Sequence, residues 1–100
     1  MPRPEATLTR KILTLFRTLP NSWWERVEQK SICGTPDILG CYQGRMVAIE
    51  VKTSKGRLSK IQEVKLDEIK KAGGLALVLN ELNYKIEHER LIRGWKAKDY

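Results

Sequence analysis

The segment that decides the fold is residues 34–52, which read GTPDILGCYQGRMVAIEVK. A short apolar run begins directly after Asp37, and a second, longer run ends in the sequence EVK. The sequence QGR between the two runs is typical of a tight hairpin turn, which would bring Asp37 beside Glu50 and Lys52. Residues two apart in a strand share a face. The sequence therefore predicts two carboxylates and one ammonium group at one spot.

This grouping of two acids and a lysine is typical of a divalent-metal site. The run 46–51 is almost wholly apolar, which fits a central strand covered on both faces. A charged Glu50 there is unfavourable unless it is paired or bound to a metal ion. A buried ion pair between Glu50 and Lys52 is the alternative, but that pair alone would not require Asp37 across the hairpin. Oxygen ligands without histidine favour Mg²⁺ or Mn²⁺ over zinc.

The same residues carry a resemblance to a known family. The arrangement of Pro36 and Asp37 with Glu50 and Lys52 resembles the PD-(D/E)xK nuclease motif. With a preceding glycine and the downstream sequence GRLSKIQ, the chain is similar to the VRR-NUC branch of that superfamily, which is related to Holliday-junction resolvases. The resemblance implies a restriction-endonuclease-like core and a metal-dependent nuclease activity.

Two further residues gain a possible role from this resemblance. Gln62 forms a Ser-x-x-Gln capping-box pattern with Ser59, which gives it a structural role. The resemblance implies that Gln62 also approaches the metal ion or its water, and the two roles are compatible. Glu5 in the first turn of a helix is favourable for the helix dipole. The resemblance implies instead that this glutamate reaches the metal site, and both interpretations stay open.

The composition favours a polyanionic partner. The 100 residues, which we predict to form a single domain over 1–100, carry 19 Lys and Arg against 12 Asp and Glu, a net charge of +7. Such a surplus is typical of nucleic-acid-binding domains, although solubility alone is an alternative explanation. The candidate DNA contacts are Lys30, Lys55, Arg57 and Lys60, for which an ordinary solvated position is equally compatible with the sequence.

Cysteine and histidine usage points away from a disulfide scaffold or a zinc site. Cys33 and Cys41 have no Cys or His partners at zinc spacing, and His88 is the single histidine. Both cysteines are predicted to be small buried hydrophobic residues in a reducing compartment. No segment has membrane-spanning length or a signal-peptide pattern. The predicted location is the cytoplasm or another reducing intracellular compartment, including that of a phage-infected host cell.

The periodicity of the remaining chain predicts an α/β fold with a mixed central sheet of about four strands flanked by helices. The predicted helices cover 4–19 and 59–72, and strands at 22–30 and 75–79 flank the hairpin. The second helix would connect two parallel strands. One of Trp23 and Trp24 should pack inward and the other outward. After residue 80 both a strand at 84–87 and a short helix around 91–95 are compatible with the pattern.

These patterns predict a metal-dependent DNA endonuclease, and the resemblance implies that it acts on branched structures such as four-way junctions. Asp37, Glu50 and the backbone carbonyl of Val51 would bind Mg²⁺ or Mn²⁺. Lys52 would orient the attacking water or stabilise the developing negative charge. The alternatives are a non-catalytic DNA-binding module of the same fold, a flap or single-strand nuclease, and an RNA-directed nuclease.

We also expect a two-fold homodimer, because resolution of a junction requires two matched incisions. The outward tryptophan of the first strand, Trp95 and the pair Leu91-Ile92 are the candidate contacts. Packing of all these groups within one monomer is the alternative.

Overall fold

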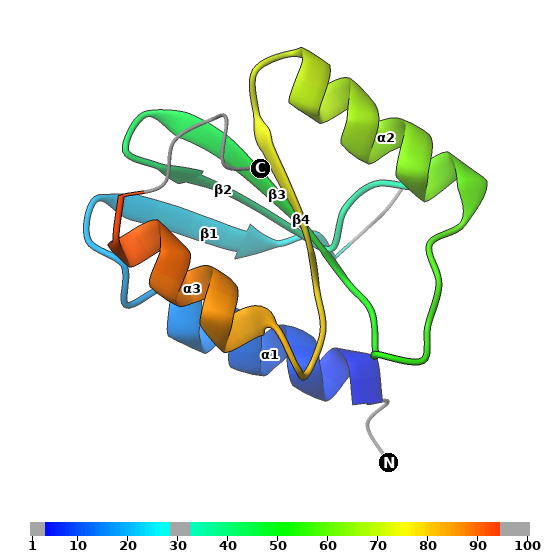
Figure 1. Cartoon of the computed structure of the whole chain (residues 1–100), viewed down its shortest axis with the longest axis horizontal. Coiled ribbons are helices and arrows are strands. Elements are labelled where there is room, and N and C mark those ends of the chain that lie inside the picture. Colours follow the sequence, from blue (N-terminus) through cyan, green and yellow to red (C-terminus); the bar gives the residue numbers. More distant parts are fainter. Residues whose placement is uncertain (1–3, 29–32, 95–100) are drawn as a thin grey trace.

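Four strands in the described part of the chain form one mixed sheet (Figure 1). The structure is a computed structural model and describes residues 4–28 and 33–94. The strands are β1 (Ser22–Arg26), β2 (Ile38–Tyr42), β3 (Arg45–Val51) and β4 (Leu75–Leu79), adjacent in that order. The pairs β1–β2 and β2–β3 are antiparallel, and β3–β4 is parallel. The predicted α/β fold with a mixed four-stranded sheet is confirmed.

Helices cover both faces of this sheet. Figure 1 shows α1 (Pro4–Phe16) and α3 (Tyr84–Ile92) on one face and α2 (Lys60–Lys71) on the other. The main core lies between the sheet and the α1–α3 pair, and β3 contributes Val47, Ile49 and Val51 to it. Strand residues alternate between faces, so Ala48 and Glu50 are turned toward the α2 side. Both are buried. Within the described ranges, no helix has the length and apolar character needed to span a lipid bilayer.

The hairpin turn lies where the sequence predicts it. Gln43 and Gly44 have φ values of 51° and 83°. Positive φ at both central residues is the requirement of a two-residue type I′ turn. The Arg45 guanidinium then donates to the Gly73 carbonyl at 3.2 and 2.7 Å, which connects the start of β3 to the turn after α2.

The two tryptophans of β1 divide between the faces as predicted. Trp24 is 2% exposed in the core and Trp23 is 59% exposed on the α2 side. Trp24 pairs with Gly40 across β1 and β2, and its ring lies over the position where a Cβ on Gly40 would be. The same ring meets Phe16 in an edge-to-face contact with centroids 5.2 Å apart. Gly40 thus makes room for the largest core side chain.

Some predicted boundaries were wrong. The first helix ends at Phe16, and the next residues form tight turns through bonds from Thr18 N to Leu15 O and from Leu19 N to Phe16 O. The first strand ends at Arg26, while the predicted residues 29 and 30 lie outside the described ranges. Residues 84–87 are helical, so the interpretation of this segment as a strand was wrong. The helix expected around 91–95 instead begins at Tyr84 and ends at Ile92. Trp95 also lies outside the described ranges.

The prediction that both cysteines are buried was wrong. Cys33 and Cys41 are free and exposed. Cys33 lies in a turn before β2, and Cys41 lies on the α2 side of the sheet beside Trp23. Because α2 covers only part of that face, a cysteine at this strand position stays in contact with solvent. Periodicity gives the face of a strand residue but not the extent of the helix above it.

Candidate metal centre

Asp37 and Glu50 occupy facing positions in the β2–β3 hairpin. Ile38, the first residue of β2, pairs with Ile49, and continuing this register by one residue places Asp37 opposite Glu50. Facing Cα atoms of antiparallel strands are about 4.5–5.5 Å apart. Glu50 is 2% exposed, and Asp37 is half-buried. The structure therefore brings the two predicted carboxylates together on the α2 side of the sheet.

The Asp37 carboxylate is fixed by the end of β3. The Val51 amide donates to Asp37 Oδ2 at 2.7 Å, while the Val27 amide donates to the Asp37 carbonyl at 2.8 Å. Asp37 thus has a structural bond in addition to any role as a ligand. The amide and carbonyl of one strand residue point to the same neighbour. The Val51 carbonyl is therefore directed toward the Asp37 side, as the predicted ligand set requires.

Gln62 combines the predicted helix cap with a contact to the Glu50 carboxylate. Its Oε1 accepts from the Ser59 amide at 2.9 Å, and its own backbone amide donates to Ser59 Oγ at 3.3 Å. This reciprocal pair is a complete capping box at the start of α2. The side-chain Nε2 donates to Glu50 Oε2 at 3.3 Å. The helix cap and the buried carboxylate therefore share one residue.

Lys52 directly follows β3, two residues beyond Glu50. It is half-buried, and its amide donates to the Leu79 carbonyl of β4 at 3.0 Å. A turn follows at once, closed by a bond from Gly56 N to Thr53 O at 2.8 Å. The cations predicted to contact DNA in this region are exposed: Lys55, Arg57 and Lys60. The fourth, Lys30, lies outside the described ranges.

The structure does not gather Glu5 with the other two acids. Across residues 4–28 and 33–94, no group of three or more acidic, histidine or cysteine side chains is arranged to hold a metal ion. Glu5 is exposed in the first turn of α1, where a carboxylate interacts favourably with the helix dipole. The helix-dipole interpretation accounts for this position.

The turn that precedes Asp37 is packed closely against α2. Gly34 has φ of 85°, and a Cβ added there would lie 3.0 Å from the Ile61 carbonyl oxygen and 3.1 Å from Lys65 Cγ. Gly34 is therefore needed both for its backbone conformation and for the close approach. The same contact explains why Lys65 lies among the apolar positions of α2, because its aliphatic stem covers this turn. A firm turn fixes the direction of Asp37.

The sequence reasoning missed Glu81, which follows β4. Its carboxylate accepts from the Ser54 amide at 2.7 Å and from the Ser54 hydroxyl at 2.8 Å. The available signal was the parallel pairing of β3 and β4, since parallel neighbours end at the same edge of a sheet. An acidic residue just after β4 therefore lies within reach of the polar loop just after β3.

The donor set fits a hard divalent cation. Asp37 and Glu50 supply carboxylate oxygens, and the Val51 carbonyl is directed to the same side, which matches the oxygen preference of Mg²⁺ and Mn²⁺. Burial of Glu50 beside a second acid is unfavourable by itself. A cation between the two carboxylates would relieve this cost.

No family model and no curated protein matches the sequence of this chain.

Proposed function

We propose that this protein is a Mg²⁺- or Mn²⁺-dependent DNA endonuclease, similar to VRR-NUC enzymes of the PD-(D/E)xK superfamily. The observation that supports this best is the 2% exposed Glu50 facing Asp37 across the β2–β3 hairpin. A module that only binds DNA has no need for a buried carboxylate beside a second acid. The neighbouring Lys52 adds the cation expected where negative charge develops.

Each residue of the site has a distinct task in this proposal. Asp37, Glu50 and the Val51 carbonyl would hold the ion, and Gln62 fixes the direction of the Glu50 carboxylate. A bound Mg²⁺ or Mn²⁺ would supply Lewis acidity at the scissile phosphate and make a water molecule more acidic. Lys52 orients that water for attack in line with the leaving oxygen, or stabilises the negative charge on the phosphate.

The proposed substrate is branched DNA. The net charge of +7 favours a polyanion, and the exposed Lys55, Arg57 and Lys60 lie on the loop and helix start that follow the site strand. The preference for branched structures follows from the resemblance to junction resolvases. Flap or single-strand DNA and RNA remain alternative substrates for the same site.

A substrate panel tests this function. Labelled four-way junction, flap, duplex, single-stranded DNA and RNA are incubated with Mg²⁺, Mn²⁺ or EDTA. We expect metal-dependent cleavage that is fastest on the four-way junction, and none in EDTA. Absence of cleavage on every substrate with Mn²⁺ would favour the non-catalytic DNA-binding module. Cleavage confined to RNA or to flaps would assign the corresponding alternative substrate.

We also propose that the active form is a two-fold homodimer. Trp23, Cys41 and Met46 form one cross-strand row on the α2 side of the sheet, and Trp23 and Met46 are 59% and 44% exposed. An exposed apolar row of this kind favours a protein contact. The edge of β1 is less suitable, because the Arg17 guanidinium donates to the Trp24 carbonyl there at 3.1 and 3.4 Å.

Sedimentation at micromolar concentration tests the dimer, with and without junction DNA. We expect a dimer of the wild-type chain and a shift toward the monomer for Trp23→Ser, which removes the largest exposed side chain of the row. Ile86→Ser is the matched control, because Ile86 is 60% exposed on α3 on the other face of the sheet. A wild-type protein that is monomeric under both conditions would exclude the dimer.

A further inference from the structure

The loop that follows β3 is held by a side chain from the neighbouring strand end. Glu81 binds residue Ser54 through both carboxylate oxygens, at 2.7 Å to the amide and 2.8 Å to the hydroxyl. Bonds to an ionised acceptor are shorter and stronger than those between neutral groups. This two-point contact fixes the position and orientation of Ser54.

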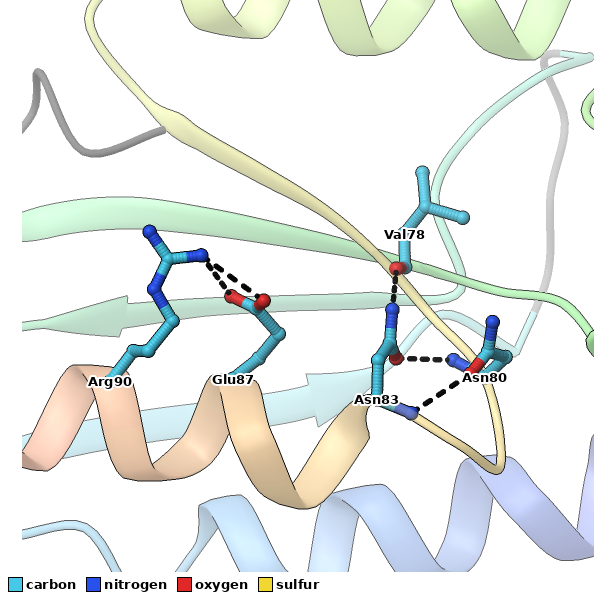
Figure 2. Close-up of polar contacts among 5 residues, drawn as sticks. All are labelled: Val78, Asn80, Asn83, Glu87 and Arg90. Atoms are coloured by element: carbon cyan, nitrogen blue, oxygen red, sulfur yellow. Dashed lines mark hydrogen bonds and ion pairs between the residues drawn. The ribbon is translucent and has the colours of Figure 1, made fainter.

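Glu81 itself is carried by a rigid turn. Figure 2 shows Asn80 and Asn83 joined by reciprocal bonds, Asn80 N to Asn83 Oδ1 at 2.8 Å and Asn83 N to Asn80 Oδ1 at 2.9 Å. Asn83 Nδ2 also donates to the Val78 carbonyl of β4 at 3.1 Å. Asn80 Oδ1 accepts a further bond from the Leu82 amide at 2.8 Å. The turn that carries Glu81 is therefore attached to β4 and to the start of α3.

The loop held by Glu81 lies beside the stem of Lys52. Ser54 is the second residue of the turn closed between Thr53 and Gly56. A Cβ on Gly56 would lie 3.6 Å from Lys52 Cδ, so the backbone of the turn passes directly beside this side chain. A displacement of Ser54 would carry the turn away from Lys52 and free its ammonium group to move.

We propose that Glu81 is a positioning residue, which fixes loop 53–58 through Ser54 and thereby holds the Lys52 ammonium group relative to Asp37 and Glu50. This inference rests on the proposed nuclease function for its kinetic consequence. Its structural part, the control of the loop by Glu81, stands independently of that function. The alternative role is that the Glu81 carboxylate occupies an anion-binding position at Ser54, from which a DNA phosphate displaces it.

The titration of Glu81 gives the contact a pH signature. The pKa of Glu81 is held below its ordinary value, first by a hydrogen bond from its own backbone amide and then by bonds from the hydroxyl and the amide of Ser54. The charge of Lys55 acts in the same direction. A group with a lowered pKa in the folded state stabilises that state above its unfolded pKa. The Ser54 contact is therefore present at neutral pH and lost as the pH falls through the lowered pKa of Glu81.

Steady-state cleavage of the preferred substrate tests the kinetic part. We expect Glu81→Ala to lower kcat by about tenfold to a hundredfold, as small misplacements of catalytic groups do, while KM for DNA changes little. Ser54→Ala keeps the amide bond and should lose less, and Ser54→Thr keeps both donors and should retain wild-type kcat. Glu89→Ala, which removes an exposed carboxylate from α3, is the matched control and should behave as wild type.

A double-mutant cycle shows whether Glu81 acts through Lys52. If it does, Glu81→Ala should lower kcat in the wild-type background and have little further effect in Lys52→Ala. Equal losses in both backgrounds would overturn the proposal. An unchanged kcat with a lower KM for DNA would also overturn it and would assign Glu81 to the anion site that DNA takes over.

Amide NMR of the protein without DNA or metal tests the structural part. The Ser54 and Gly56 signals should titrate with Glu81 in the wild type, and this transition should be absent in Glu81→Gln. If the wild-type chain cleaves no nucleic acid, the proposed function fails while this titration still supports control of the loop. Identical pH profiles in the wild type and Glu81→Gln would show that Glu81 does not hold the loop, whatever the activity.

Discussion

Asp37→Asn and Glu50→Gln are each expected to abolish DNA cleavage and to leave the fold intact. Each change removes one ligand charge and little volume. An asparagine can still accept the bond from the Val51 amide, and a glutamine can still accept from Gln62. Each variant also removes one of two neighbouring like charges. We therefore expect both to be at least as stable as the wild type in the absence of divalent ions.

The measurement combines cleavage of the preferred substrate with Mn²⁺ binding by calorimetry and thermal unfolding in EDTA. Asp67→Asn is the matched control, since Asp67 is an exposed acid on α2 that pairs with Lys71 at 2.9 Å. It should cleave at the wild-type rate. Near wild-type cleavage by either Asp37→Asn or Glu50→Gln would contradict the assignment of the site.

The largest effect on stability is expected for Gly40→Ala. The added Cβ would overlap the Trp24 ring and lie 2.5 Å from the Trp23 carbonyl oxygen. The backbone contact cannot be relieved by a change of rotamer, so β1 must move away from β2 and the Trp24 ring must shift with it. Overpacking of this kind costs about 3 kcal/mol or more. Such a loss is a large part of the total stability of a small domain.

Urea unfolding followed by tryptophan fluorescence measures this loss as a lower midpoint. Gly44→Ala is the informative comparison, because a Cβ there has no neighbour within 4 Å but must adopt φ of 83°. Its expected cost is about 1–2 kcal/mol, from the left-handed backbone alone. Equal midpoints for Gly40→Ala and the wild type would show that β1 and β2 are not packed as described.

The sheet could be predicted because its elements are encoded locally. Alternation in β1 placed Trp23 and Trp24 on opposite faces, and the QGR turn set the register that brings Asp37 opposite Glu50. The parallel pairing of β3 and β4 followed from the helix between them. The first two predictions depend on residues that are near one another in the sequence, and the third depends on the helix that connects the two strands.

What could not be predicted depends on how far one element extends over another. The exposure of Cys41 follows from the part of the sheet that α2 leaves open, which no pattern within β2 encodes. The Val51 amide bonds to the side chain of Asp37 at a point where β2 has not yet begun, because that strand starts at Ile38 and its first pair is Ile38 with Ile49. Glu81 and Ser54 are 27 residues apart in the sequence, and only the assembled sheet brings them together.

The shared role of Gln62 limits which sequences can have this site. A capping box ordinarily accepts glutamate as readily as glutamine at its fourth position. Here the amide nitrogen of Gln62 must also donate to the buried Glu50 carboxylate, which a glutamate would repel instead. The helix alone would tolerate either residue, so the amide at position 62 is required by the neighbouring acid. Among diverged sequences of this fold, glutamate at this position would therefore mark those in which the acid opposite Asp37 had already been lost.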